Sequence, residues 1–326
     1  MSSIIWAKIR RKIWAKIVFN ARGKNIYYWI YSSYWHYKFG SNNTACKEFN
    51  YYSAVPNQGA GIGHQMANWI AGYWFAKQFE LKFAHIPFSN NSWEIFLGFG
   101  ENEITVNELV DKQGYKKVLL PLFNEYNSHE VEVIKKIISS YQSQKVVFIA
   151  EQDQFYKNQY GNIDELKRKF YAAKSRKKDK LIFSEEYFNI AIHIRRGDVT
   201  VGQLNNNPNL QLRWQDNSYF IKVLENVIES TKTLKPIRIF LFSQGEKNDF
   251  SDFNKFKNIE YCLDMGAKDS FLHMVYADVL ITSKSSFSYK PALLSNGIKV
   301  VPEEFWHGYP ENKDWILTDG SGIVNF

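Results

Sequence analysis

From about residue 51 onward, short apolar runs alternate with longer runs that have the periodicity of amphipathic helices. The strand-like runs lie at about 51–55, 81–88, 117–123, 145–150, 189–194, 236–244, 257–264, 278–283 and 298–302. The helix-like runs lie at about 66–79, 128–141, 217–230, 269–277 and 287–297. Because strands alternate with helices, the sequence predicts an α/β fold with two Rossmann-like parallel sheets.

The length of 326 residues favours more than one domain, because single hydrophobic cores stop growing at roughly 250–300 residues. The stretch 161–180 is highly charged and ends in a basic cluster, as a solvated helix and connector would. We therefore expect a basic amphipathic tail over 1–45 and two Rossmann-like domains, over 46–175 and 176–326, facing a cleft.

The formal net charge of +8 comes from one end of the chain. Residues 1–40 hold eight Lys or Arg residues and no acid, which leaves 33 residues of each sign in the rest. A nucleic-acid-binding domain would carry a basic stripe on its folded surface, so we expect no nucleic-acid partner.

The repeat Ile-Trp-Ala-Lys-Ile at 5–9 and 13–17 gathers apolar side chains on one side of a helix, among five cations. The segment is too charged to span a bilayer and lacks the apolar run of a signal peptide. One interpretation is a helix on an anionic membrane surface; the other is a packed surface helix or a disordered leader.

The two cysteines, Cys46 and Cys262, are typical of free thiols in a reducing compartment. Together with the basic amphipathic tail, they lead us to expect a cytoplasmic, peripherally membrane-associated protein.

Charged residues follow directly on the strand-like run 189–194. On an extended strand the three isoleucines share one face, and His193 and Arg195 share the other, near the carboxyl end. Ligands of open α/β sheets bind at that end, and a guanidinium is a planar fork for two phosphate oxygens. Arg195 is therefore a candidate contact to a nucleotide diphosphate. We expect Asp198 to pair with Arg196; alternatively, an Arg–Asp pair merely caps the strand and His193 is satisfied internally.

Two further stretches precede helix-like runs. The turn after 278–283 is rich in hydroxyls, and one serine would suffice as a cap, so the cluster favours an anion such as phosphate. Its members are Ser283, Lys284, Ser285, Ser286 and Ser288. The block 59–64 has glycines that permit close backbone approach, but it matches neither the dinucleotide nor the P-loop fingerprint. Its candidate site residues are Gly61, Gly63 and His64.

Metal-ligating patterns are missing from the sequence. No two aspartates stand at positions i and i+2, and no His/Cys/Asp cluster has metal spacing. We therefore expect no metal and no cofactor, and phosphate binding by arginine and helix N-termini.

Three stretches together resemble the fucosyltransferase superfamily, which contains α1,2-, α1,6- and protein O-fucosyltransferases. The residues His193, Arg195, Arg196 and Asp198 are similar to its HxRRxD motif, and the stretch 269–297 is similar to its C-terminal block. The stretch 61–79 is similar to its G-x-G-N-Q block, with His64 in place of the asparagine.

The resemblance implies a GT-B-like fold, GDP-fucose as donor, inversion at the anomeric carbon and no metal requirement. By position it implies that Arg195 contacts the β-phosphate, that His193 and Asp269 contact guanine, and that Ser285 and Ser286 hold phosphate oxygens. It also implies that Arg196 and Asp198 shape the loop. In some α1,6 relatives a glutamate ten residues after the motif histidine is the proposed base, and Gln203 occupies that position here.

The base is therefore open between Asp198, His64, Glu94 and a departing phosphate oxygen. The leading hypothesis is transfer of fucose to a hydroxyl of a glycan or surface-polysaccharide precursor. A donor such as GDP-mannose is one alternative, and a catalytically inactive, membrane-associated glycan- or nucleotide-binding protein is another. We expect the domain over 176–326 to bind the GDP-sugar and the domain over 46–175 to form the acceptor side, with acceptor specificity from its loops at 89–103 and 151–162.

Overall fold

The computed structural model describes residues 49–141, 144–151, 159–200, 207–263 and 265–324, with four isolated positions nearer the N-terminus. These residues form two compact units. Unit 1 contains the described residues of 1–53, 75–84 and 104–151, and unit 2 contains 54–74, 85–103 and the described residues from 159 onward. The predicted division at residue 175 stays a prediction.

Unit 1 contains a four-stranded sheet in the order β2-β1-β4-β3. The strands are β1 (Tyr51–Ala54), β2 (Lys82–Phe83), β3 (Lys116–Leu119) and β4 (Val146–Ala150), and the pairs β1–β2 and β3–β4 are parallel. Every residue of β4 is buried, as expected for an inner strand of a parallel sheet. The helices α5 (Val106–Gln113) and α6 (Ser128–Ser139) begin at side-chain caps, Thr105 and Asn127.

Unit 2 contains a six-stranded parallel sheet in the order β10-β9-β8-β5-β6-β7. Its strands are β5 (Phe188–His193), β6 (Ile237–Phe242), β7 (Ile259–Cys262), β8 (Val279–Ile281), β9 (Ile298–Pro302) and β10 (Trp315–Thr318). The chain runs outward from β5 to β7 and then returns to β8 on the other side of β5. This is the Rossmann strand order, with a direction switch between β5 and β8. The predicted α/β class with parallel sheets is therefore confirmed.

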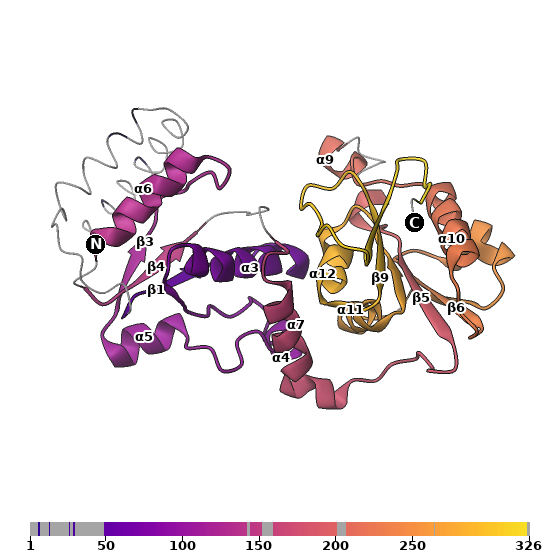
Figure 1. Ribbon diagram of the computed structural model, residues 1–326, viewed down its shortest axis with the longest axis horizontal. Helices are drawn as coiled ribbons and strands as arrows, with labels where there is room; N and C mark the ends of the chain where they lie inside the picture. Colours follow the sequence, from indigo (N-terminus) through magenta and orange to yellow (C-terminus); the bar gives the residue numbers. More distant parts are fainter. Residues whose placement is uncertain are drawn as a thin grey trace. The chain divides into compact units, whose positions relative to one another are not determined.

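Helices cover both faces of this sheet (Figure 1). On one face, α10 (Asn217–Ser230) and the 3₁₀ helix η3 (Lys247–Lys255) share a buried core with the isoleucines of β5. On the other face lie α11 (Ala267–Tyr276) and α12 (Ser286–Leu294). Unit 2 also contains α4 (Asn91–Leu97), α7 (Ile163–Ala172), η2 (Lys174–Lys178), α9 (Pro208–Gln211) and the N-terminal part of α3 (Ile62–Gln78).

The stretch 89–103, which we expected to be a loop, contains the helix α4. Asn90 accepts a hydrogen bond from the Ser92 amide at 2.8 Å, and Gly98 ends the helix in the left-handed conformation. A polar cap and a glycine stop therefore enclose a helix of only seven residues. Short helices of this kind have too little periodicity to stand out in a sequence.

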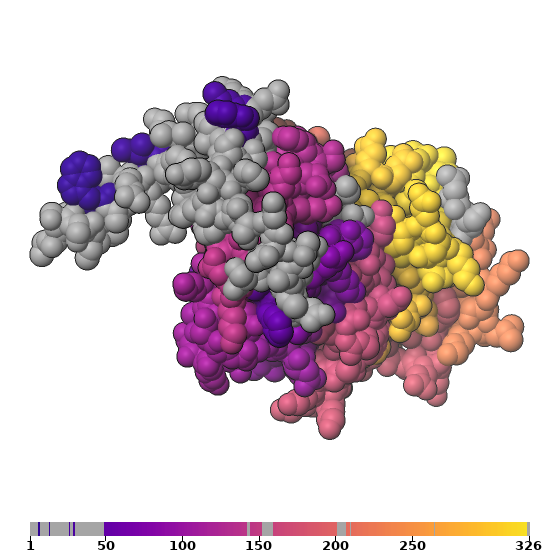
Figure 2. Space-filling view, turned by 60° about the vertical axis from the view of Figure 1, so that its left-hand side comes forward, coloured from indigo at the N-terminus to yellow at the C-terminus, as the bar shows by residue number. Residues whose placement is uncertain are grey.

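Most of the predicted tail lies outside the described residues, as do Gln203, Cys46 and the stretch 152–158. The four isolated positions, Trp6, Ile13, Ile26 and Trp29, are helical and exposed (Figure 2). In the part of the chain that the structure describes, no helix has the length and apolar character needed to cross a bilayer. Attachment to a membrane surface stays a prediction.

Candidate active site

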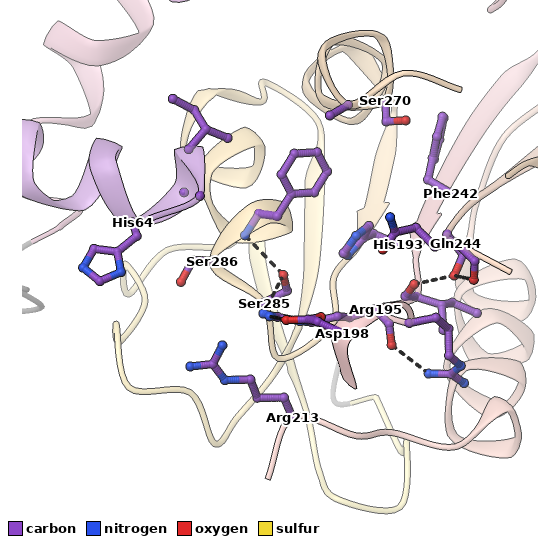
Figure 3. Close-up of a pocket in the computed structure, with 18 of the residues that line it drawn as sticks. His64, His193, Arg195, Asp198, Arg213, Phe242, Gln244, Ser270, Ser285 and Ser286 are labelled. Atoms are coloured by element: carbon purple, nitrogen blue, oxygen red, sulfur yellow. Dashed lines mark hydrogen bonds and ion pairs between the residues drawn. The ribbon is translucent and has the colours of Figure 1, made fainter. Parts of the chain in front are cut away.

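The switch between β5 and β8 determines where the candidate site lies, because ligands of doubly wound sheets bind outside the carboxyl ends of the strands at this point. A cavity of about 490 Å³ lies there, within unit 2. Nine site residues predicted from the sequence line this cavity (Figure 3). Those residues are Gly61, Gly63, His64, His193, Arg195, Arg196, Asp198, Ser285 and Ser286.

The central charged contact of the cavity joins Arg195 to Asp198. Arg195 donates from Nη2 to Asp198 Oδ2 at 2.7 Å and from Nε to Oδ1 at 3.3 Å. The expected pairing of Asp198 with Arg196 is therefore wrong. Burial alone would raise the pKa of Asp198, but the hydrogen bond and charge of Arg195 outweigh it and hold that pKa below its ordinary value. Arg195 also points Nη1 at Ser285 Oγ, at 3.5 Å.

Arg196 has a different role, because its side chain supports the loop. Its guanidinium donates to Asn217 Oδ1 at 2.7 Å and to the Arg195 carbonyl at 3.0 Å. The same group lies 4.2 Å from the ring centre of Trp214. The neighbouring Gly197 has φ +68°, and a Cβ there would collide with the Gln244 side chain. The turn after β5 thus directs Arg195 into the cavity while Arg196 fixes the backbone behind it.

His193 is buried at the end of β5. Its Nδ1 lies 2.8 Å from Ser283 Oγ, and its ring packs on Phe287 at a centroid distance of 5.5 Å. Burial, followed by the charges of Arg195 and Arg196, lowers the pKa of His193 to about 3. The imidazole is therefore neutral near pH 7. It can donate one hydrogen bond and accept another, but it contributes no positive charge to the cavity.

The hydroxyls of the serine turn all have partners inside the protein. Ser285 caps α12 by accepting from the Phe287 amide at 3.2 Å, and Ser288 bonds back to the Ser283 backbone. Ser283 meets His193, as described above, and Ser286 Oγ lies 3.1 Å from His307 Nε2. These internal hydrogen bonds account for the serines of the turn without a bound anion. A ligand would bind the turn by exchanging some of these bonds.

Two helix N-termini meet beside Arg195. The backbone at Gly63 lies so close to α12 that a Cβ there would be 2.7 Å from the carbonyl carbon and oxygen of Ser286. Deeper in unit 2, the fully buried Lys290 of α12 donates to Gln159 at 2.8 Å, and Gln159 donates to the Ala67 carbonyl of α3 at 3.1 Å. The positive ends of two helix dipoles therefore face the same cavity, which favours an anionic ligand.

One end of the cavity contains residues that sequence reasoning missed. Figure 3 shows His64, Ser286 and Arg213 around this end, and Phe242, Gln244 and Ser270 around the other. The guanidinium of Arg213 lies 5.0 Å from the ring centre of Trp306. Arg213 follows α9 and Trp306 follows β9, outside any recognisable motif. Only the general rule that loops after strands form ligand sites could have drawn attention to Trp306.

Asp269 and Glu94 stand apart from this cavity. Asp269 lies in the first turn of α11 and is not among the lining residues, and its carbonyl is 2.6 Å from His273 Nδ1. Glu94 is occupied elsewhere, because it pairs with His85 Nε2 at 2.8 Å and accepts from the Phe88 amide at 2.9 Å. The helix α4, which carries Glu94, is thereby tied to a buried histidine.

The described residues include no group of three or more His, Cys, Asp or Glu side chains placed to hold a metal ion. Cys262 is a buried free thiol, and burial raises its pKa to about 12, so it stays protonated and unreactive. The free state expected for Cys262 is confirmed.

No family model matches the chain, and no curated protein matches it. Solved structures similar to it include POFUT1 in complex with GDP, at 12% identity over 79% of this chain and 99% of that one, with a TM-score of 0.48. POFUT1 in complex with GDP-fucose shows 11% identity over 81% and 99%, with a TM-score of 0.45. The fucosyltransferase NodZ from Bradyrhizobium shows 11% identity over 77% and 93%, with a TM-score of 0.41.

Proposed function

We propose that the chain is a glycosyltransferase that moves fucose from GDP-fucose to a hydroxyl of a glycan or surface-polysaccharide precursor. One observation carries the proposal: the Arg195 fork lies at the switch point of a Rossmann sheet, beside the N-termini of α3 and α12. Such a site suits a nucleotide diphosphate. The choice of fucose and guanine depends on the resemblance of residues 61–79, 193–198 and 269–297 to the fucosyltransferase superfamily. We call the cavity that Arg195 lines the donor cavity.

In the proposed step, the acceptor hydroxyl oxygen attacks the anomeric carbon of the donor from the side opposite the diphosphate. The bond from that carbon to the β-phosphate oxygen breaks, and its electron pair stays on the phosphate. The hydroxyl proton passes to a base, and the configuration inverts. Arg195, and Arg213 at the same cavity, would offset the negative charge that develops on the leaving group.

We assign the base to His64. Of the three side chains considered, Glu94 is tied to His85 away from the cavity, and Asp198 is tied to Arg195 with a lowered pKa. His64 lines the cavity at the end that contains Ser286 and Arg213 (Figure 3). A neutral imidazole can accept a proton near pH 7, which a carboxylate of low pKa does poorly.

The decisive experiment compares Arg195→Lys and Arg195→Ala with the wild-type chain. GDP affinity is measured by calorimetry, and turnover is measured with GDP-fucose, GDP-mannose and UDP-glucose. A lysine keeps the charge but loses the fork, so both variants should lower kcat/KM by about 10²–10³. Arg168→Lys, which alters an ion pair with Glu165 on α7, is the matched control and should leave turnover unchanged.

Near-wild-type turnover in Arg195→Ala would refute the assignment, and preference for another nucleotide sugar would replace fucose with that sugar. Absence of any turnover, with GDP still bound, would favour the catalytically inactive binding protein.

We also propose that residues 1–40 attach the chain to an anionic membrane. Replacing the five cations of residues 8–16 with glutamine in the full chain should abolish its sedimentation with anionic liposomes.

A further inference from the structure

A second cavity, of about 370 Å³, lies in unit 2 next to the donor cavity. It is formed by the segments that follow β9 and β10, the first turns of α10, and one residue of the serine turn. Its lining residues are Trp214, Gln215, Asp216, Ser218, Tyr219, Lys222, Lys284, Pro302, Glu303, Glu304, Thr318, Asp319, Gly320 and Ser321.

The strand order fixes how the two cavities follow one another. The donor cavity extends over the carboxyl ends of β7, β6, β5 and β8, whereas the second cavity extends over those of β8, β9 and β10. Adjacent residues of the chain divide between the two cavities at 213 and 214 and at 284 and 285, and residues 304 and 306, one residue apart, divide in the same way. The second cavity therefore adjoins the end of the donor cavity that contains Arg213 and Trp306.

The two cavities differ in charge. Three arginines and one carboxylate line the donor cavity. In the second cavity, two lysines face four carboxylates, those of Asp216, Glu303, Glu304 and Asp319. The excess of carboxylates over lysines in the second cavity disfavours binding of a second phosphate or another anion. The hydroxyls of a neutral ligand, in contrast, can donate hydrogen bonds to these carboxylates.

Several polar groups of the second cavity are available to such a ligand. The Glu303 carboxylate forms no hydrogen bond with the described residues, and Glu303 is exposed. Lys284 Nζ lies 3.4 Å from Glu304, whose side chain is 81% exposed, so this pair can reorganise at little cost. Trp214 adds a flat, half-buried ring whose Nε1 donates to Asp216 at 2.8 Å. Carboxylates around an aromatic ring suit a polyhydroxylated ligand.

We propose that this second cavity binds the acceptor of the transferase, a neutral carbohydrate. The inference depends on the proposed function, since only a sugar-transfer enzyme needs a hydroxyl-rich acceptor beside its donor site. The strand order then places the nucleoside over β6 and β7, the diphosphate over β5 and β8, and the acceptor over β9 and β10. The C-terminal part of unit 2 lies at the surface, in yellow in Figure 2, and Gly320 and Ser321 of the second cavity are exposed.

Two glycines provide a matched test. A Cβ added at Gly320 in the second cavity, or at Gly61 in the donor cavity, would meet nothing within 4 Å, and neither glycine requires a positive φ. Gly320→Gln should therefore fill the second cavity, and Gly61→Gln the donor cavity, without disturbing the fold. We expect Gly320→Gln to raise the acceptor KM more than about tenfold while acceptor-free hydrolysis of GDP-fucose is unchanged. Gly61→Gln should impair both reactions.

Direct binding is measured from the indole N–H signal of Trp214, assigned by its loss in Trp214→Phe. The probes are the methyl glycosides of glucose, galactose and N-acetylglucosamine, lactose, and glucuronic acid as the anionic control. At about 50 mM, a neutral sugar that binds with a millimolar Kd should shift this signal in the wild-type chain but not in Gly320→Gln. Glucuronic acid should shift it less.

Failure of this inference can be told apart from failure of the proposed function. If GDP-fucose is hydrolysed but no neutral sugar shifts the Trp214 signal, or if Gly320→Gln transfers to acceptor as well as the wild-type chain, the second cavity is not the acceptor site. If GDP-fucose is neither bound nor hydrolysed, the proposed function fails. In that case a sugar shift that Gly320→Gln abolishes would still identify a carbohydrate site, although not an acceptor site.

Discussion

Asp198 holds Arg195 through two hydrogen bonds, of 2.7 and 3.3 Å, at the centre of the donor cavity. The Arg195 side chain is 18% exposed and the Asp198 side chain 57% exposed, so the carboxylate is the partner more accessible to solvent. A diphosphate that uses the same guanidinium must share it with Asp198 or displace it. The carboxylate therefore competes with the ligand and also repels it.

Asp198→Asn should consequently bind GDP more tightly than the wild-type chain. The loss of one partly exposed ion pair corresponds to about a two- to fivefold change in Kd, which salt should reduce. Calorimetry at low and high salt measures the effect. Asp252→Asn, an exposed residue of η3 that lines neither cavity, removes the same charge and serves as the control. Weaker binding by Asp198→Asn would show that the carboxylate organises the phosphate site instead of competing for it.

His64→Asn should separate chemistry from donor binding. The substitution puts in place the residue of the G-x-G-N-Q block, keeps a polar side chain at the cavity and removes the proton acceptor. We expect kcat to fall by about 10² while the Kd for GDP changes little.

His129→Asn, at an exposed histidine of α6, is the control for the loss of an imidazole. Should His64→Asn match the wild-type chain in kcat, His64 would not be the base. A departing phosphate oxygen would then be the leading acceptor of the proton.

Gly63→Ala should damage the donor cavity through its backbone. A Cβ at residue 63 would lie 2.7 Å from the Ser286 carbonyl group, so α3 and α12 must separate at their N-termini. We expect a loss of about 1–3 kcal/mol in the free energy of unfolding and weaker GDP binding. Gly61→Ala, whose Cβ would meet nothing within 4 Å, should change neither. Equal stability and GDP affinity in the two variants, by urea unfolding and calorimetry, would contradict the close approach.

Much of unit 2 could be predicted because its strands are apolar runs separated by turn residues and helical patterns. The run 189–194 and the stretch 278–302 specify two neighbouring strand ends, and the Rossmann order brings them together. The resemblance implied that Arg195 and Ser285 both contact phosphate, and the structure places their side chains 3.5 Å apart. Periodicity predicted the strands, and the motif resemblance predicted that the two residues share a site.

Side-chain pairing could not be predicted in the same way. Spacing alone allows Asp198 to reach either arginine, and the choice depends on Asn217 and Trp214, which hold Arg196. Glu94 was available as a base in the sequence, but the buried His85 binds it. Arg213 and Trp306 approach each other from segments nearly a hundred residues apart, so no local pattern reports them.

His193 should make stability depend on pH. Burial lowers its pKa to about 3 in the folded protein, against about 6.5 in the unfolded chain. Between these values the unfolded state binds more protons, so stability is complete above about pH 6.5 and is lost as the pH falls toward 3. From pH 7 to 5 this one group should remove about 2 kcal/mol from the free energy of unfolding. His193→Asn, which can still reach Ser283, should flatten that slope in urea unfolding, whereas His129→Asn should not. Equal slopes in the wild-type chain and in His193→Asn would mean that the folded protein does not lower the pKa of His193. An anion near the imidazole would then have to offset its burial and the charges of Arg195 and Arg196.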